Sequence, residues 1–319
     1  DPKFLHGAVA ESWQIPEIGT FVYQIRRGVR YGLNPASEAS RLVNGRELNA
    51  DDVVYSIQRD FDEPLSPPRI AMPAGIKAAS VNKTGPWEVT LKAPVDTWRA
   101  GFYFLWSSRL YVPEVVKKYG DMNNWRNSVG AGAFMLTDYV PGSSVTLARN
   151  PNYFDREPVG PGKGDQLPYV DTYKMLIIPD VSTRMAAFRT GKLDLAHLVV
   201  ADDAKSLKKT AQWINIGKQR TPFPLGISLR ADKLELPYKD IRVRQALTMA
   251  TDFDSIVNQY YSGDAVKIAW PVGPSKSQEG AYWPFDTLPQ NAKDLYTYNP
   301  EKAKQLLKEA GYPNGFKSK

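Results

Sequence analysis

The sequence predicts a mixed α/β fold (α+β) with two or more lobes, and three observations support this prediction. Segments with alternating apolar residues and segments with helical apolar spacing follow one another without the strict repeat that a barrel requires. The chain has 319 residues, which is more than one compact core usually holds. Hydrophobic residues make up 42% and charged residues 24%, and this composition is typical of a globular protein.

The first predicted elements are two strands and two helices. The segments Thr20–Arg26 and Trp87–Leu91 alternate apolar and polar residues, which indicates half-buried strands. Asn49 suits the N-cap of a helix whose first turn is acidic. The apolar residues of this helix recur at helical spacing: Val54, Ile57 and Phe61. Pro113 suits the first turn of a shorter helix that ends near Gly120.

The middle of the chain predicts a hairpin, a loop and a third strand. Phe134–Val140 and Val145–Arg149 alternate on either side of the turn Pro141-Gly142, which indicates a β-hairpin. The segment Pro158–Pro168 contains three glycines, so we expect a surface loop there. The apolar segment Tyr173–Ile178 predicts a buried strand.

The next segment predicts a helix followed by a short strand. Ser182 suits the N-cap of a helix that ends at Gly191. Leu193–Leu195 then predicts a short strand. The basic segment Lys205–Lys209 is short, and we interpret it as the solvated face of a helix.

Three more helices are predicted towards the C-terminus. Asp240 caps a helix that carries Val243, Leu247 and Ala250 on one face, and Asp252 opens a second helix. The last helix has the clearest signals. Its N-cap, its first position and its C-terminal cap are expected at three residues: Asn299, Pro300 and Gly311.

Charge and cysteine content exclude several classes of protein. The formal net charge is +7, from 41 Lys and Arg against 34 Asp and Glu, but no basic stripe is present, so we expect no nucleic-acid partner. The chain has no cysteine, so it contains neither disulfides nor thiolate metal sites. No apolar stretch reaches the roughly 18 residues of a membrane span. The chain begins at Asp1 without a signal peptide, so we expect a mature or trimmed segment of a longer protein.

Catalytic motifs are missing as well. The two histidines, His6 and His197, are far apart and have no carboxylate at metal-ligand spacing. No Gly-x-Ser-x-Gly elbow and no phosphate-binding glycine motif is found. Adjacent carboxylates, Asp51-Asp52 and Asp202-Asp203, point different ways on a helix. We therefore expect no metal, no cofactor and no catalysis, with a secreted hydrolase that uses a carboxylate pair as a minor alternative.

Six segments in order carry a family resemblance. They include NGRELNADDVVYSIQR, GAGAFMLTDYVPGSSVTLARNPNY and NPEKAKQLLKEAGYPNGF. Their positions are Val9–Tyr31, Asn44–Arg59, Gly130–Tyr153, Ile178–Leu195, Asp240–Asp254 and Asn299–Phe316. Together they resemble solute-binding protein family 5, the peptide, nickel and oligosaccharide receptors of ABC importers. Each segment alone also fits a scaffold role, so the resemblance predicts the fold before it predicts a site.

The resemblance implies a two-lobed periplasmic-binding-protein-like fold of type II, cluster C. Residues 1–128 would form a smaller subdomain of lobe I, residues 129–222 its main body, and residues 223–319 the start of lobe II. Members of the family extend beyond this chain at both ends. We therefore expect an incomplete second lobe and unpaired sheet edges.

The function that the resemblance implies is solute capture without chemical change. The protein would be an extracytoplasmic receptor, either periplasmic or a cell-surface lipoprotein, and monomeric when full length. Its partners would be a peptide or similar polar organic solute and the membrane subunits of an ABC importer. An oligosaccharide receptor is the alternative, because aromatic residues make up 12% of the chain and sugar rings stack on them. Two histidines make a nickel receptor less favoured.

Candidate contact residues follow from position and residue type. In peptide-binding relatives an aromatic and an amide follow the short strand at 193–195, where this chain has His197 and Leu198. Phe223 lies between two prolines, where the chain is expected to cross into the second lobe. The remaining candidates are large aromatic residues expected at the cleft: Phe104, Trp106, Trp270 and Trp283.

Overall fold

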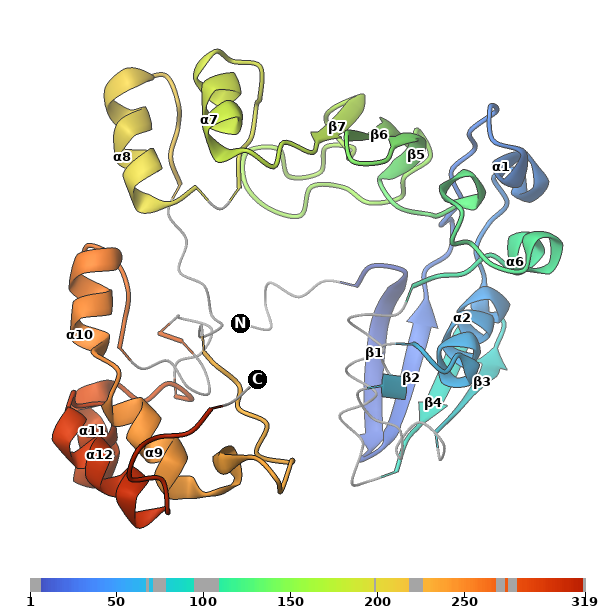
Figure 1. Cartoon of the computed structure of the whole chain (residues 1–319). Coiled ribbons are helices and arrows are strands. Elements are labelled where there is room, and N and C mark those ends of the chain that lie inside the picture. The colour runs from blue at the N-terminus through green and yellow to red at the C-terminus, as the bar shows by residue number, and fades with distance from the viewer. Residues whose placement is uncertain are drawn as a thin grey trace. The chain divides into compact units, whose positions relative to one another are not determined.

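The computed structural model divides the chain into two units, Asp1–Pro179 and Asp180–Lys319. Figure 1 shows both sheets in the first unit, whereas the elements of the second unit are helices in the described residues. The described residues are 7–66, 69–70, 79–94, 109–197, 199–217, 226–267, 273–274 and 280–317. Helices and strands are mixed without a regular alternation, which confirms the mixed α/β class.

The first unit begins with a four-stranded antiparallel sheet. Its strands lie in the order β1 (Ala10–Glu17), β2 (Thr20–Ile25), β4 (Glu88–Lys92) and β3 (Ser80–Gly85). The two predicted strands, β2 and β4, lie at its centre and carry buried residues in register, with Phe21, Tyr23 and Ile25 buried on β2. β1 and β3 were not predicted, because these edge strands are largely exposed and polar and lack a clear apolar alternation.

Helices of the first unit begin where the caps predict. α2 (Ala50–Asp62) is capped by Asn49 in a capping box, and α6 (Pro113–Tyr119) ends at Gly120, whose φ is +83°. Two short helices, α1 (Glu38–Val43) and the 3₁₀ turn η3 (Trp125–Asn127), complete this part.

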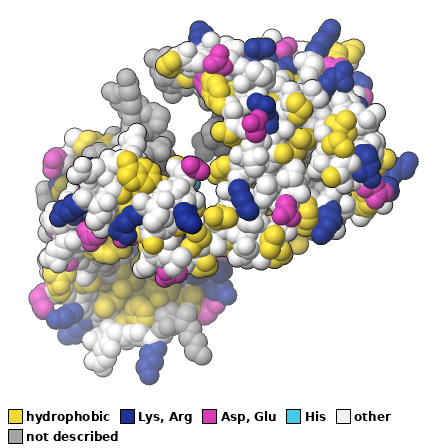
Figure 2. All heavy atoms as spheres, turned by 90° about the horizontal axis from the view of Figure 1, so that it is seen from above, with side chains coloured by type: hydrophobic (Ala, Val, Ile, Leu, Met, Phe, Trp, Pro, Cys, Tyr) yellow, Lys and Arg dark blue, Asp and Glu magenta, His cyan; other side chains and the backbone are white. Residues whose placement is uncertain are grey.

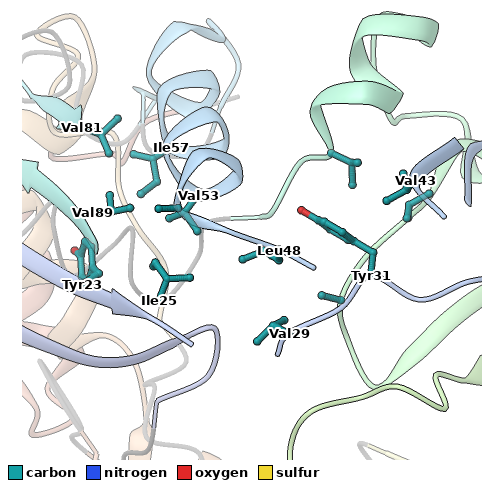
Figure 3. Packing of buried hydrophobic residues seen from close by; sticks show 14 of the residues in the cluster. Tyr23, Ile25, Val29, Tyr31, Val43, Leu48, Val53, Ile57, Val81 and Val89 are labelled. Carbon is teal, nitrogen blue, oxygen red and sulfur yellow. The ribbon is translucent and has the colours of Figure 1, made fainter. Parts of the chain in front are cut away.

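The core of the first unit lies between α2 and the four-stranded sheet. Figure 3 shows Val53 and Ile57 of α2 directed towards Val81 and Val89 of the sheet. Phe61 is also buried, whereas the predicted Val54 is only half buried at the margin of the same core. The buried stripe of α2 therefore follows positions 53, 57 and 61, one residue earlier than predicted at its start.

A second sheet follows, with three antiparallel strands in the order β5 (Phe134–Val140), β6 (Ser144–Arg149) and β7 (Thr172–Leu176). The predicted hairpin is confirmed, and the loop at 158–168 is formed by turns. The prediction of a buried strand at 173–178 is wrong. β7 is an edge strand whose five residues are all exposed, because nothing in the described part of the chain covers it.

The second unit begins with α7 (Val181–Arg189) and α8 (Ala201–Thr210), which pack around Met185, Phe188 and Leu207. The predicted cap of α7 is wrong by two residues. Asp180, not Ser182, accepts the Thr183 N–H at 2.7 Å. The predicted strand at 193–195 is not formed, because no neighbouring strand pairs with this segment among the described residues.

The remaining elements of the second unit are mainly helical. They are η4 (Pro237–Lys239), α9 (Ile241–Met249), α10 (Phe253–Ser255), the π-helix η5 (Ile256–Tyr260), η7 (Phe285–Thr287), α11 (Gln290–Leu295) and α12 (Pro300–Glu309). The helix predicted after Asp252 is thus one α-turn that continues as a π-helix. The caps at Asp240 and Asn299 are confirmed.

α9 and α12 form the third core of the chain. Ala246, Met249 and Ala303 are buried between them, and the Asn299 N–H donates to the Met249 carbonyl at 2.8 Å. Leu247 was predicted on the buried face of α9 but is exposed, because the close contact with α12 is made through small side chains instead. None of the helices in the described residues is long and apolar enough to cross a lipid bilayer.

Candidate solute-contact residues

Two of the seven predicted contact residues, His197 and Trp283, lie within the described residues, and both belong to the second unit. The other five predicted residues lie outside them: Leu198, Phe223, Phe104, Trp106 and Trp270. No hydrogen bond, ion pair or ring contact joins His197 to Trp283 in the described structure. Their common role in one site stays a prediction.

His197 is exposed on the segment that joins α7 to α8. Gly191, with a φ of +68°, turns the chain after α7. Leu193 and Ala196 then pack against the Met185–Phe188–Leu207 core, and this packing leaves the next side chain outside it. Within the described residues, the imidazole has no hydrogen-bond or ion-pair partner. No carboxylate orients it as a catalytic base would require, so both ring nitrogens are available to a bound molecule.

The start of α7 helps to fix this segment. Hydrogen bonds from Thr183 hold the pKa of the Asp180 carboxyl below its ordinary value, since they favour the charged form. A carboxylate at a helix N-terminus is also favoured by the helix dipole. Asp180 is therefore an anchor of the helix rather than a candidate acid or base.

Trp283 lies just before η7, with 61% of its surface exposed. The neighbouring Phe285 ring is held by the Lys267 ammonium, which lies 4.8 Å from the ring centroid. Lys267 also pairs with Asp254 at 2.8 Å. These contacts fix the segment against α10 and leave the indole able to stack on a planar or ring-shaped solute.

Two small hollows lie in the described part of the first unit, and neither has the size of a solute pocket. One has a volume of about 80 Å³, room for two or three water molecules. It is lined mainly by the start of β5 and the loops before α1 and β5: Gly32, Asn34, Ser40, Ser128, Val129, Gly130, Phe134, Met135 and Leu136. The other, of about 270 Å³, is an open surface depression beside Arg27, Trp87 and Glu88. Ligand pockets usually hold about 300–1,000 Å³ and enclose most of the ligand.

A half-buried ion-pair cluster around the buried Asp52 carboxylate was not predicted from the sequence. Arg46 makes two hydrogen bonds of 2.7 Å to the Asp52 carboxylate and another of 2.8 Å to Glu114 Oε2. Its guanidinium lies 5.1 Å from the ring centroid of Tyr31. The spacing of Asn49 and Asp52, N-cap and N3 of one helix, was the available signal for a structural carboxylate here.

The contacts within this cluster shift the pKa of three members, Glu114, Arg46 and Tyr31. Hydrogen bonds from Arg46 lower the pKa of the Glu114 carboxyl, and those to Asp52 and Glu114 raise the pKa of Arg46. Burial raises the pKa of the Tyr31 hydroxyl, so the ring stays neutral. These pKa shifts keep Glu114 and Arg46 charged and Tyr31 neutral, which suits a clamp between α2 and α6 rather than catalysis.

No three His, Asp or Glu side chains gather as metal ligands in the described part of the chain. On the face shown in Figure 2, Lys and Arg side chains are interspersed with acidic ones rather than gathered in a stripe.

The comparisons with known proteins agree with this picture. The model of the family described as bacterial extracellular solute-binding proteins, family 5 middle, matches residues 5–319. Heme-binding protein A of Haemophilus influenzae is 29% identical over 330 residues, covering 98% of this chain and 54% of the relative. The dipeptide-binding protein of Escherichia coli is 27% identical, covering 97% of this chain and 55% of the relative.

Solved structures show the same fold over part of their length. The oligopeptide-binding protein AppA of Bacillus subtilis, solved with a nonapeptide, matches with a TM-score of 0.70 at 26% identity. The match covers 95% of this chain and 55% of AppA. The periplasmic binding protein DppA of Helicobacter pylori, solved with the peptide STSA, matches with a TM-score of 0.69 at 24% identity.

The matches cover nearly all of this chain but only part of each relative. The chain spans about half the length of the curated relatives that it matches. The family match, in contrast, covers nearly the whole of this chain. The chain belongs to the bacterial extracellular solute-binding proteins of family 5, which bind solutes and are not enzymes.

Proposed function

We propose that this chain is part of an extracytoplasmic receptor that captures peptides or similar polar organic solutes for an ABC importer. The observation that carries the proposal is the match to AppA, a peptide-bound relative of the same family, over 95% of this chain. The whole protein would act as a monomer, in the periplasm or as a cell-surface lipoprotein. It would pass its solute unchanged to the membrane subunits of the importer.

The proposed mechanism is closure of two lobes on the solute. In this scheme residues 1–128 and 129–222 belong to lobe I, and residues 223–319 begin lobe II. A solute that contacts both lobes only in the closed state shifts the equilibrium towards closure by its differential affinity. His197 would contact the solute from lobe I and Trp283 from lobe II, and Phe223 would lie at the crossing.

The residues assigned to contact would act by non-covalent recognition. The unpaired imidazole of His197 can donate one hydrogen bond and accept another, which suits the polar groups of a peptide main chain. The exposed ring of Trp283 can cover an apolar or planar part of the solute. Phe104, Trp106, Trp270 and Leu198 stay proposed contacts from residue type and position.

Calorimetric titration of the whole protein with a panel of di- to nonapeptides tests this proposal. We expect saturable binding, weakened about tenfold by His197→Ala or Trp283→Ala, as expected for the loss of roughly 1.4 kcal/mol of contact energy. Trp213→Ala is the matched control, because Trp213 is 62% exposed but is not assigned to the site. Absence of binding to every peptide, or an equal loss in the control, would contradict the proposal.

One observation favours a second solute class. His197 is the one histidine among the described residues, and its ring is unpaired and exposed, so it offers the accessible ring nitrogen that haem iron needs. The relative from Haemophilus influenzae is named as a haem-binding protein. Titration with haemin separates the two classes. A shifted Soret band that is lost in His197→Ala would favour haem over peptide.

Oligosaccharides stay the alternative of the same family. The exposed indole of Trp283 supports it, because sugar rings stack on indole faces. The same titration with linear oligosaccharides tests it, and binding of these with no binding of peptides would replace the leading proposal. A titration with Ni²⁺ tests the less favoured alternative of a nickel receptor.

A further inference from the structure

The open depression at one end of the four-stranded sheet has opposite charges on its walls. It is lined by the turn between β3 and β4 together with Gln24, Arg27 and Glu88. Its volume of about 270 Å³ corresponds to about nine water molecules at about 30 Å³ each, so a single small solute fits it. Arg27 supplies the positive charge and Glu88 the negative one.

The Glu88 carboxylate is held in place by two hydrogen bonds. Gln24 lies directly opposite on β2, and its side-chain amide donates to Glu88 Oε2 at 2.7 Å. Thr84 is the extra residue of a bulge in β3, and its hydroxyl donates to Glu88 Oε1 at 2.7 Å. A Cβ added at Gly85 would lie 3.2 Å from Glu88 Cβ, so the glycine leaves room for this side chain. Each carboxylate oxygen still has a free lone pair for a bound molecule.

The Arg27 guanidinium is held by a different contact. Its Cζ atom lies 5.8 Å from the ring centroid of Trp87, within the range of a cation–π interaction. The ring packs against the core of the first unit, and the Trp87 carbonyl accepts the Ile25 N–H at 2.7 Å. Among the described residues, the guanidinium has no hydrogen-bond or ion-pair partner. Its planar N–H groups are therefore available to a carboxylate, which they can bind through two parallel hydrogen bonds.

The two charges line one depression without pairing with each other. No ion pair joins Arg27 to Glu88 in the part of the chain that the structure describes. Coulomb attraction favours such a pair, but Trp87 holds one charge while Gln24 and Thr84 hold the other. A simple anion would be repelled by the carboxylate, and a simple cation by the guanidinium. The space between them therefore suits a molecule that carries both charges.

We propose that this depression binds a free α-amino acid as its zwitterion. The carboxylate of the amino acid would accept hydrogen bonds from Arg27, its ammonium group would donate to Glu88, and its side chain would lie against Trp87. Because the depression is open, we expect a dissociation constant of about 1–10 mM. The site belongs to the first unit, whereas His197 and Trp283 belong to the second, so the proposal does not rest on the proposed function.

A titration followed by residue-resolved NMR tests the proposal on the whole protein. The ligands are L-phenylalanine, N-acetyl-L-phenylalanine, which lacks the ammonium group, and L-phenylalaninamide, which lacks the carboxylate. We expect L-phenylalanine to cause saturable shifts in the amides of residues 84–88 and in the Trp87 indole N–H. Each blocked derivative should bind about tenfold more weakly, as expected for the loss of one charge-assisted contact.

Two substitutions assign the two ends of the ligand. Arg27→Gln should weaken L-phenylalanine binding about tenfold and leave L-phenylalaninamide binding unchanged. Glu88→Gln should weaken L-phenylalanine binding by a similar factor and leave N-acetyl-L-phenylalanine binding unchanged. Arg30→Gln is the matched control, because Arg30 is exposed but bonds to the Gly45 carbonyl at 3.2 Å instead of lining the depression. A variant that failed to fold would lose all three ligands, and this result differs from both expected patterns.

Four outcomes would overturn the proposal. Residues 84–88 could show no shifts with L-phenylalanine. The three ligands could bind equally, which would leave only a contact with the Trp87 ring. Arg30→Gln could weaken binding as much as the two site variants do. Shifts confined to the surroundings of His197 and Trp283 would place the amino acid in the candidate solute site instead.

Discussion

The Arg46 guanidinium donates two hydrogen bonds of 2.7 Å to the Asp52 carboxylate, and the Asp52 side chain is only 3% exposed. The same Asp52 carboxylate accepts the Asn49 N–H at 3.0 Å and so closes the capping box of α2. One carboxylate thus couples the start of α2 to the loop that carries Arg46. Since Arg46 also binds Glu114, the contact extends to α6.

Removing Arg46 should destabilise the first unit. Arg46→Met leaves the Asp52 carboxylate buried without its cation, and we expect the free energy of unfolding to fall by about 2–4 kcal/mol. This loss is smaller than that for a wholly buried ion pair, because the Arg46 side chain is 30% exposed. Urea denaturation measures the change. Lys83→Ala is the control, because its pair with Asp51 is exposed and should contribute less than about 1 kcal/mol. Equal losses for the two variants would contradict the clamp.

The same cluster should make stability depend on pH in acid. The pKa of Glu114 is lowered in the folded state, so its contribution is complete above its ordinary value of 4.5 and is lost as the pH falls through the lowered value. Glu114→Gln should therefore flatten the fall in unfolding free energy below about pH 4.5. Denaturation curves at a series of pH values measure this. An unchanged acid slope in the variant would show that Glu114 has no such role.

The N-cap of α2 offers a local test. Asn49→Ala removes the acceptor of the Asp51 and Asp52 N–H groups and should cost about 1 kcal/mol. Asn49→Asp should restore most of this stability, because it keeps the acceptor and adds a charge that suits the helix N-terminus. Thermal denaturation of both variants decides the matter. An Asn49→Ala variant as stable as the wild type would show that the cap contributes nothing measurable.

The contact between α9 and α12 should tolerate little extra volume. Ala303 is 3% exposed against Ala246 and Met249, so Ala303→Leu should force the helices apart and destabilise this pair by about 1–3 kcal/mol. Lys302→Leu adds a similar side chain one position earlier, on the exposed face of α12, and serves as the control. A control as destabilising as Ala303→Leu would contradict the packing.

Local elements could be predicted where the signals lie within one segment. Asn49, Gly120 and Asn299 mark helix ends through their own caps, and the hairpin at β5 and β6 carries its turn in Pro141-Gly142. Each signal acts over four or five residues. The structure confirms all of them.

Features that depend on distant partners could not be predicted in the same way. Glu114 lies 68 residues from Arg46, and no local pattern links them. The apolar content of β7 predicts burial, yet its exposure depends on whether another segment covers it. Of the candidate site, the sequence identifies residue types, and the structure places His197 and Trp283 on exposed segments. The proposal that one solute contacts both residues depends on lobe closure, which no local pattern encodes.

Native mass spectrometry of the whole protein, incubated with a defined peptide mixture, tests whether the protein captures a solute and leaves it unchanged. We expect a one-to-one complex whose peptide, released by denaturation after prolonged incubation, has its original mass. Recovery of the peptide as shorter fragments, or a protein that retains no peptide, sugar or haem at all, would rule out solute capture.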